Sequence, residues 1–239
     1  YIIMALPVLN TPKFKLKLPS DNRVVNYRPF LVKEEKILLI ATETGEQAEL
    51  ITAIKNIIKA CTDIKDVEHL STFDIEYVFL QIRTKSVGES VEVGVTCPDD
   101  NETLVEVKIP LDSIKVQKTK GHNKEIKMSD EIMITMNYPS LDTFVKANFV
   151  DNQQDVDQVF DMAASCVATV TTPEEVHNCK EMPKAEVLEF LDQMSSAQFK
   201  KVQDFFETMP KLSHKLKVTN PKTKVVSDVT LEGLASFFG

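Results

Sequence analysis

The chain has 239 residues, of which 43% are hydrophobic and 27% charged, and its formal net charge is −8. This composition is typical of a globular protein that buries a sizeable core, as one large domain or two small ones. The negative charge argues against DNA or an anionic membrane as the main partner, and no apolar run approaches the roughly 20 residues that span a bilayer.

The first predicted element is a short strand near the N-terminus. In the segment PKFKLKLPS, Phe14, Leu16 and Leu18 alternate with lysines, which is the period of a half-buried strand. At this net charge, the lysine row indicates the solvated face of an edge strand rather than a nucleic-acid contact. The residues before it are too few and too uncharged for a secretory signal, and Met4 is the expected natural start.

Three mainly apolar segments follow this strand. Residues 27–43 contain the run ILLIA, which fits either a buried strand or a short core helix, because periodicity alone does not decide between them. Residues 46–61 predict a helix with one apolar stripe. Residues 71–85 predict a second helix, with Ser71 or Thr72 as a cap and Asp74 at its positive end. This second helix is apolar on more than one side, so we expect it to be central.

Two alternating strands around a polar turn predict a β-hairpin, at Val91–Cys97 and Val105–Ile109. The turn sequence CPDDNET resembles half of a zinc knuckle, in which two cysteines flank a two-residue turn. Here the position of the second cysteine is occupied by Asp100.

A long polar stretch, residues 115–131, predicts a mobile loop. It also predicts a division into an N-terminal α+β lobe, residues 4–120, and a C-terminal mainly helical lobe, residues 121–239, with one compact unit as the alternative. Residues 132–136 predict a short strand, and a helix is expected to begin near Pro139.

The C-terminal third is predicted to be mostly helical. Residues 156–167 carry one amphipathic face, and residues 172–183 form a polar connector. Residues 184–194 and 196–209 predict a helical hairpin whose second arm is capped by Ser195. We interpret the phenylalanine stripe of that second arm as core rather than as a cofactor contact.

Residues 216–239 repeat the plan of the first hairpin, with a connection predicted to be three residues shorter. The sequence VTCP of the first hairpin corresponds to VTNP in the second. Only Cys97 remains of the four thiolates that two zinc knuckles would supply, since Asp100, Asn220 and Thr223 occupy the other places.

A closed structural zinc site needs four ligands, so the sequence predicts no metal site and no bound cofactor. The predicted fold class is α+β, with a mainly helical core and two zinc-ribbon-like β-hairpins that lack a full ligand set. The hairpins are then a relic or a mimic of a zinc ribbon, held by apolar strands and turn chemistry.

Catalytic residues are not predicted anywhere in the chain. None of the four histidines lies in a recognisable motif, and no phosphate-binding or dinucleotide fingerprint is present. His177 and Cys179 lie close in sequence, but in a polar connector where a solvated loop is the better interpretation. The four cysteines are expected to be reduced thiols. We therefore expect a protein that is not an enzyme.

Several stretches together resemble one family. They are LPVLNTPKF, YRPFLVKEEKILLIA, the CPDD hairpin, FFETMPKL and LEGLASFF. The chain is similar, over essentially its whole length from Met4, to the baseplate hub subunits and hub assembly proteins of T-even-type contractile-tailed phages. Members of that family often carry cysteine pairs in the hairpins, and this chain departs from them there.

The resemblance implies a non-enzymatic assembly factor of the baseplate hub, chaperone-like, or alternatively a structural hub subunit retained in the virion. It implies other baseplate hub proteins as partners, with no nucleic acid and no membrane, and it leaves the oligomeric state open. The expected location is the host cytoplasm during assembly or the virion tail baseplate. The residues predicted to dock on a partner are Tyr27, Arg28, Phe30, Leu234, Phe237 and Phe238. For the apolar tail among them, self-packing is favoured over docking, because the preceding strand already returns the chain to the core.

Overall fold

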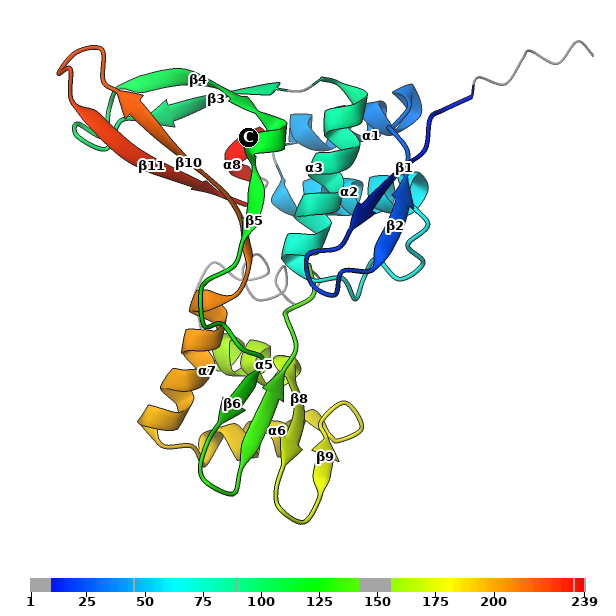
Figure 1. The fold of residues 1–239 in the computed structure, drawn as a ribbon, viewed down its shortest axis with the longest axis vertical. Coiled ribbons are helices and arrows are strands. Elements are labelled where there is room, and N and C mark those ends of the chain that lie inside the picture. The colour runs from blue at the N-terminus through cyan, green and yellow to red at the C-terminus, as the bar shows by residue number, and fades with distance from the viewer. Residues whose placement is uncertain (1–9, 45, 89, 142–155, 234, 239) are drawn as a thin grey trace, which may run out of the picture.

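The computed structural model describes residues 10–44, 46–88, 90–141, 156–233 and 235–238. These residues form two bodies, an upper one built from α1–α3 and two long hairpins and a lower one built from β6–β9 and α5–α7 (Figure 1). Among the helices that are described, none is long and apolar enough to cross a membrane.

Three helices and a two-stranded sheet build the first core, which we call the N-terminal core. The predicted strand at Phe14 pairs antiparallel with the segment after it. Ile54, Ile57 and Ile58 of the second helix are buried on one stripe, as their spacing predicted. The elements are β1 (Phe14–Lys17), β2 (Val24–Tyr27), α1 (Val32–Thr44), α2 (Gln47–Cys61) and α3 (Thr72–Ser86).

The open alternative for residues 27–43 is settled in favour of a helix, α1. Its apolar run does not lie in the core as a whole, because Ile37, Leu39 and Ile40 are exposed whereas Leu38 is buried. The prediction of a central helix at 71–85 is confirmed, since α3 buries seven of its residues.

Ser71, one of the two predicted caps, is the N-cap residue of α3, but it does not cap in the usual way. Ser71 makes no side-chain cap bond to the helix backbone. Its hydroxyl instead donates to the Asp74 carboxylate at 2.6 Å, and that carboxylate also accepts the Ser20 N–H at 3.0 Å. Asp74 therefore ties the start of α3 to the β1–β2 turn.

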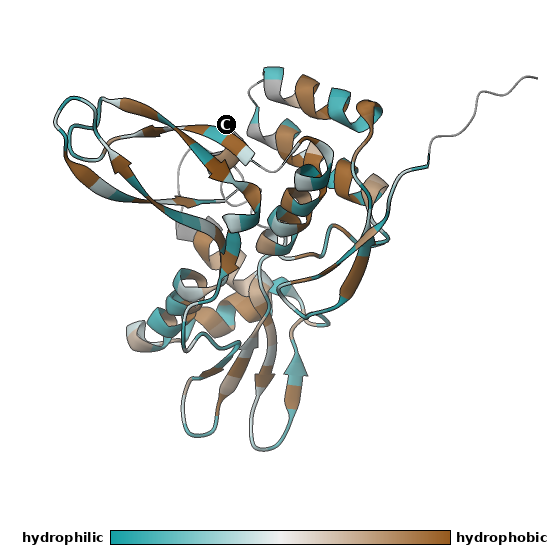
Figure 2. Ribbon diagram, turned by 45° about the horizontal axis from the view of Figure 1, so that its top comes forward, coloured by the Kyte–Doolittle hydropathy of each residue, from teal (hydrophilic) through white to brown (hydrophobic). Residues whose placement is uncertain are grey.

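Two hairpins and α8 build the second core, which we call the hairpin core. Apolar and polar residues alternate along both hairpins (Figure 2), and the apolar ones meet between them, together with Leu80 of α3 and Phe237 of α8. The predicted mobile loop at 115–131 is partly wrong, because it contains β5, which pairs with β10, and β6. The elements are β3 (Ser90–Thr96), β4 (Leu104–Pro110), the 3-10 turn η1 (Leu111–Ser113), β5 (Lys115–Gln117), β10 (Lys211–Thr219), β11 (Val226–Glu232) and α8 (Ala235–Phe238).

A four-stranded antiparallel sheet and three helices build the third core, which we call the C-terminal core. The predicted amphipathic helix and the predicted helical hairpin are present, and Ser195 caps the second arm in a capping box with Gln198. Three short strands in this region were not predicted, β6, β8 and β9. The elements are β6 (Glu125–Lys127), β7 (Met133–Met136), α5 (Val156–Cys166), β8 (Val167–Thr171), β9 (Val176–Asn178), α6 (Lys184–Asp192) and α7 (Ser196–Thr208).

The predicted fold class, a mainly helical core, is wrong. The structure is 37% helical and 29% strand, and its described strands form antiparallel sheets of two, three, two and four strands. Several of these strands are only three to five residues long. Runs of three to five residues hold too few positions for alternation to identify them, and β5 pairs with β10, which is distant in sequence.

The second hairpin lies beside the first one rather than with the helices that precede it in the chain (Figure 1). Its first strand, β10, also pairs with β5, which follows the first hairpin, through three residue pairs, from Lys211 with Gln117 to Ser213 with Lys115. The division of the chain near residue 120 stays a prediction. The helix expected near Pro139 falls mostly on residues 142–155, outside the described residues.

Candidate functional site

The turns of the two hairpins have the same backbone geometry. In the first, the Cys97 N–H donates to Thr103 and the Cys97 carbonyl accepts from Asn101; in the second, Asn220 makes the equivalent bonds to Val225 and Lys224. Asn101 and Lys224 both have positive φ, of 54° and 65°. The predicted structural repeat is therefore present at the turns. The second connection is one residue shorter than the first, not three, because Thr96 pairs with Leu104 and Thr219 with Val226.

Where two zinc knuckles would share a metal, these two turns share hydrogen bonds. The Asn220 side-chain amide donates to both oxygens of Asp99 at 3.1 Å and to Asp100 Oδ2 at 2.9 Å. The Thr223 hydroxyl donates to Asp99 as well. Asn220 is fully buried and its own Oδ1 accepts the Lys222 N–H at 2.8 Å. We call Asp99, Asp100, Asn220 and Thr223 the turn clasp.

Hydrogen bonds and burial set the pKa values of the ionisable groups at the two turns. Hydrogen bonds from Thr223 and Asn220 hold the pKa of Asp99 below its ordinary value. Hydrogen bonds from Thr103, the Glu102 N–H and Asn220 hold the pKa of Asp100 well below its ordinary value. Burial raises the pKa of the Cys97 thiol, and the two aspartates raise it further. A neutral thiol is a poor metal ligand. In the described part of the chain, no group of three or more His, Cys, Asp and Glu side chains could hold a metal ion.

We predict that the purified protein carries no stoichiometric zinc and that EDTA leaves its melting temperature unchanged. The reason is that the turn clasp already joins the two turns through hydrogen bonds that need no metal. Elemental analysis and thermal melts with and without EDTA test this. About one zinc per chain, with a lower melting temperature after chelation, would contradict it.

The predicted docking residues Tyr27 and Phe30 are both buried in the N-terminal core. Arg28 is partly exposed and donates through Nη2 to Glu34 Oε1 and to the Ala60 carbonyl, each at 3.0 Å. Glu34 in turn accepts the Leu31 N–H at 2.7 Å. Burial alone would raise the pKa of Glu34, but the bonds from Arg28 and Leu31 outweigh it and hold this pKa below its ordinary value. This group fixes the start of α1, and its docking role stays a prediction.

The exposed surface of α1 is apolar to an unusual degree, next to that ion pair. The exposed fractions are 67% for Val32, 43% for Ile37, 55% for Leu39 and 62% for Ile40. The preceding Leu31 is 41% exposed. Scattered exposed hydrophobic residues are normal, but five within ten residues are concentrated on one short helix, and such a concentration often marks a contact with another molecule. We call Leu31, Val32, Ile37, Leu39 and Ile40 the α1 patch.

The apolar tail is attached to the protein's own core at Phe237, which is 1% exposed and belongs to the hairpin core. For this residue, self-packing is observed, and no surface remains for docking. Leu234 and the side chain of Phe238 lie outside the described residues, so the tail prediction is not answered for them.

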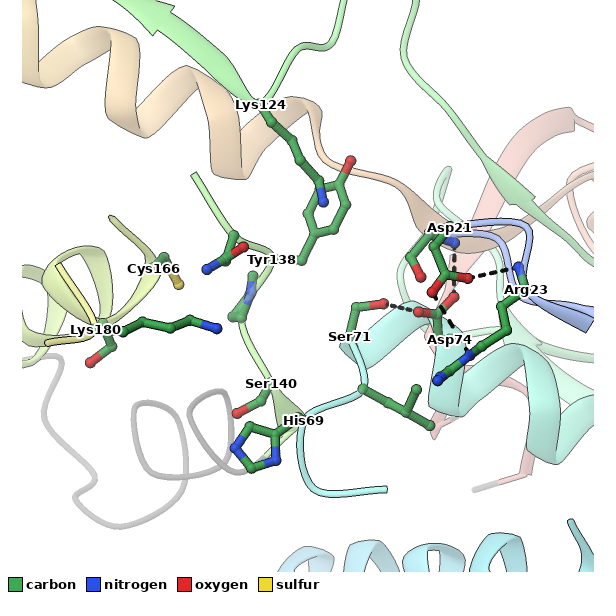
Figure 3. A pocket seen from close by; sticks show the side chains of 15 residues that line it. Asp21, Arg23, His69, Ser71, Asp74, Lys124, Tyr138, Ser140, Cys166 and Lys180 are labelled. Carbon is green, nitrogen blue, oxygen red and sulfur yellow. Dashed lines mark hydrogen bonds and ion pairs between the residues drawn. The ribbon is translucent and has the colours of Figure 1, made fainter. Parts of the chain in front are cut away.

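A pocket of about 450 Å³ lies between the upper and lower bodies (Figure 3). Arg23, His69 and Asp74 line it from the upper body, and Lys124 and Lys180 from the lower. Burial raises the pKa of Asp74 despite its bonds from Ser20 and Ser71.

Cys166 is the one cysteine among the described residues that line this pocket, and its thiol is not activated. Burial raises the pKa of Cys166 to about 12, so the thiol stays protonated at neutral pH. His69 is exposed and pairs with Asp66 at 2.7 Å. The Cys/His pair considered from sequence, His177 and Cys179, is not activated either. His177 pairs with Glu175, and burial raises the pKa of the Cys179 thiol.

An aromatic cluster beside the pocket connects the two bodies. Tyr138 of the lower body packs edge-on against Phe73 of α3, at 4.9 Å between ring centroids, and stacks on His122 and Phe205. The Thr208 hydroxyl donates to the Asp204 carbonyl, so His122 Nδ1 donates to Thr208 and its Nε2 accepts from the Tyr138 hydroxyl. The neutral imidazole therefore satisfies every bond at this position.

We predict that this histidine makes the protein less stable in mild acid. Burial, and then Lys124, lower the pKa of His122, so below pH of about 6.5 the unfolded chain takes up the proton before the folded protein does. The free energy of unfolding should fall from pH 7.5 to pH 5.5, and by less in His122→Gln. Urea titrations at both pH values test this, and an equal fall in both proteins would contradict it.

Sequence reasoning missed two of these features. Ile37, Leu39 and Ile40 of the α1 patch were expected to be buried, since their apolar run indicates a core segment more often than a surface. The lysines at 33 and 36 interrupt the apolar side of the helix, and this could have indicated that the side faces solvent. The contacts of Asn220 with Asp99 and Asp100 join residues about 120 positions apart, and no local sequence pattern predicts them.

Comparison with known proteins identifies the family. The model of the family described as T4 bacteriophage base plate protein matches residues 11–239. Comparison with curated proteins and with solved structures gives no match. The matched range includes α1, both hairpins and every core, so the chain belongs to the T4 bacteriophage base plate protein family.

Proposed function

We propose that this baseplate protein is a hub assembly factor that acts through protein–protein contacts, without catalysis and without a bound metal or cofactor. It binds other hub proteins in the cytoplasm of the infected cell and leaves before the tail is complete. The observation that carries the proposal is the α1 patch, five exposed hydrophobic residues on a helix whose start is fixed by the Arg28–Glu34 pair.

The physical argument is that such a patch is costly for a protein that works alone. Each large aliphatic side chain left in water forgoes about 1.5–3 kcal/mol that burial would contribute. Covering it on a partner recovers part of this free energy, and the fixed start of α1 presents the patch with little loss of conformational freedom.

The assembly role is tested by locating the protein during infection. Quantitative mass spectrometry should find it with hub intermediates isolated from infected cells and not in purified mature particles. A fixed number of copies per mature particle would instead identify a structural subunit that is retained in the hub.

A further inference from the structure

The charges around the α1 patch are arranged in a self-complementary way. Lys36 lies about one turn before the Leu39–Ile40 pair, and Glu43 lies about one turn after it. Because the two charges are seven residues apart, they lie on the same side of the helix. Both are exposed, and within the described residues neither forms an ion pair.

We propose that α1 packs antiparallel against α1 of a second copy of the chain, around a two-fold axis between Leu39 and Ile40. In this arrangement, Leu39 and Ile40 of one copy meet Ile40 and Leu39 of the other. Lys36 of each copy then faces Glu43 of the other, so both charge pairs are attractive. A parallel arrangement would place like charges opposite each other and is disfavoured.

A second copy is favoured over an unrelated partner because a two-fold contact requires a surface that complements itself. One stretch of helix supplies both the apolar centre and the two opposite charges at its ends. An interface of one helix per copy is at the small end of the range for specific contacts, so we expect a dimer that dissociates on dilution in the micromolar range. This inference shares one premise with the proposed function, namely that the α1 patch is a contact with another protein.

Analytical ultracentrifugation of the full chain over a range of concentrations tests this. Wild-type protein should show a monomer–dimer equilibrium. Ile40→Glu should be monomeric with an unchanged melting temperature, because Ile40 is exposed in the monomer. Lys36→Glu and Glu43→Lys should each weaken the dimer about tenfold or more, since both symmetric pairs become repulsive.

The charge exchange provides the decisive control. The double variant Lys36→Glu/Glu43→Lys restores both attractive pairs and should dimerise within about threefold of wild type. Mixing the two single variants should likewise restore a dimer. Wild-type protein that stays monomeric at hundreds of micromolar, or a dimer that is insensitive to these substitutions, would overturn the proposal.

The two proposals fail separately in these experiments. If the wild-type protein is monomeric but Ile40→Glu loses binding to another hub protein, the α1 patch is a contact for that protein and the two-fold dimer is wrong. If the dimer forms as described but the protein is present in mature particles, the dimer stands and the assembly role is wrong.

Discussion

Replacing Phe237 with alanine should destabilise the protein by about 3–5 kcal/mol, the usual cost of removing a fully buried phenylalanine. Phe237 is 1% exposed and lies between the two hairpins in the hairpin core. The substitution leaves a cavity that the surrounding strands cannot close, because the turn clasp and the β5–β10 pairing hold the hairpins in place. Urea-induced unfolding followed by circular dichroism measures the change.

Leu104→Ala is the matched control for this prediction. Leu104 is also a large apolar residue of the hairpins, but it is 64% exposed, so its removal should change the free energy of unfolding by about 0.5 kcal/mol or less. Equal stabilities of Phe237→Ala and wild type would mean that the tail is not part of the core. Deleting residues 234–239 should have an effect at least as large as the single substitution.

Replacing Asn220 with alanine should also destabilise the protein, by about 3 kcal/mol, because a buried amide that bonds two carboxylates is lost. Asn220→Asp should be worse, although it has nearly the same shape, since it places a third carboxylate against Asp99 and Asp100. Lys222→Ala, in the same turn but with an exposed side chain, should be nearly neutral.

The pH dependence of stability in these variants tests whether the Asp99 and Asp100 carboxylates cause the loss of stability. The pKa values of Asp99 and Asp100 are lowered in the folded protein, so their stabilising effect is present above their unfolded pKa and is lost as the pH falls below about 4. The wild-type protein should therefore lose stability there, and Asn220→Ala should lose less. The deficit of Asn220→Asp relative to wild type should shrink as the carboxylates become protonated. A deficit that is constant with pH would contradict this role of the turn clasp.

The elements that sequence predicted well are those in which local pattern and tertiary burial agree. α2 buries the stripe that its spacing defines, and α7 begins with a capping box that its sequence contains. The two hairpins were found from alternation and from the repeated VTCP and VTNP turns. In each of these, a single segment carries enough information to define its own structure.

The errors arose where distant residues decide the structure. β5 forms because β10 lies beside it, and β8 because it lies between β7 and β9. The pairing strand of β5 is distant in sequence, so the three residues of β5 were taken as loop and the fold as mainly helical. The apolar run in α1 was expected to be buried. An apolar pattern alone does not specify whether the side chains face the core or the surface.

Three of the predicted docking residues, Tyr27, Arg28 and Phe30, come just before α1, and their docking role stays a prediction. Tyr27 and Phe30 were chosen because they belong to a distinctive block, YRPFLVKEEK, and both are buried. Arg28 in the same block holds Glu34 and so fixes the helix that carries the exposed residues. The distinctive sequence thus contains the ion pair that fixes the start of α1.

Complementation of a phage that lacks this protein tests the central claim, that the protein works through the α1 patch, most directly. Cells would supply wild-type protein, Ile40→Glu or Val176→Glu, and assembled baseplates would be counted by electron microscopy of infected-cell lysates. Val176 is 63% exposed and lies on β9 of the lower body, so it matches Ile40 in exposure but not in location. We predict wild-type numbers of baseplates with Val176→Glu and a loss of baseplates with Ile40→Glu, although both variants melt like wild type. Wild-type numbers of baseplates with Ile40→Glu would contradict the account.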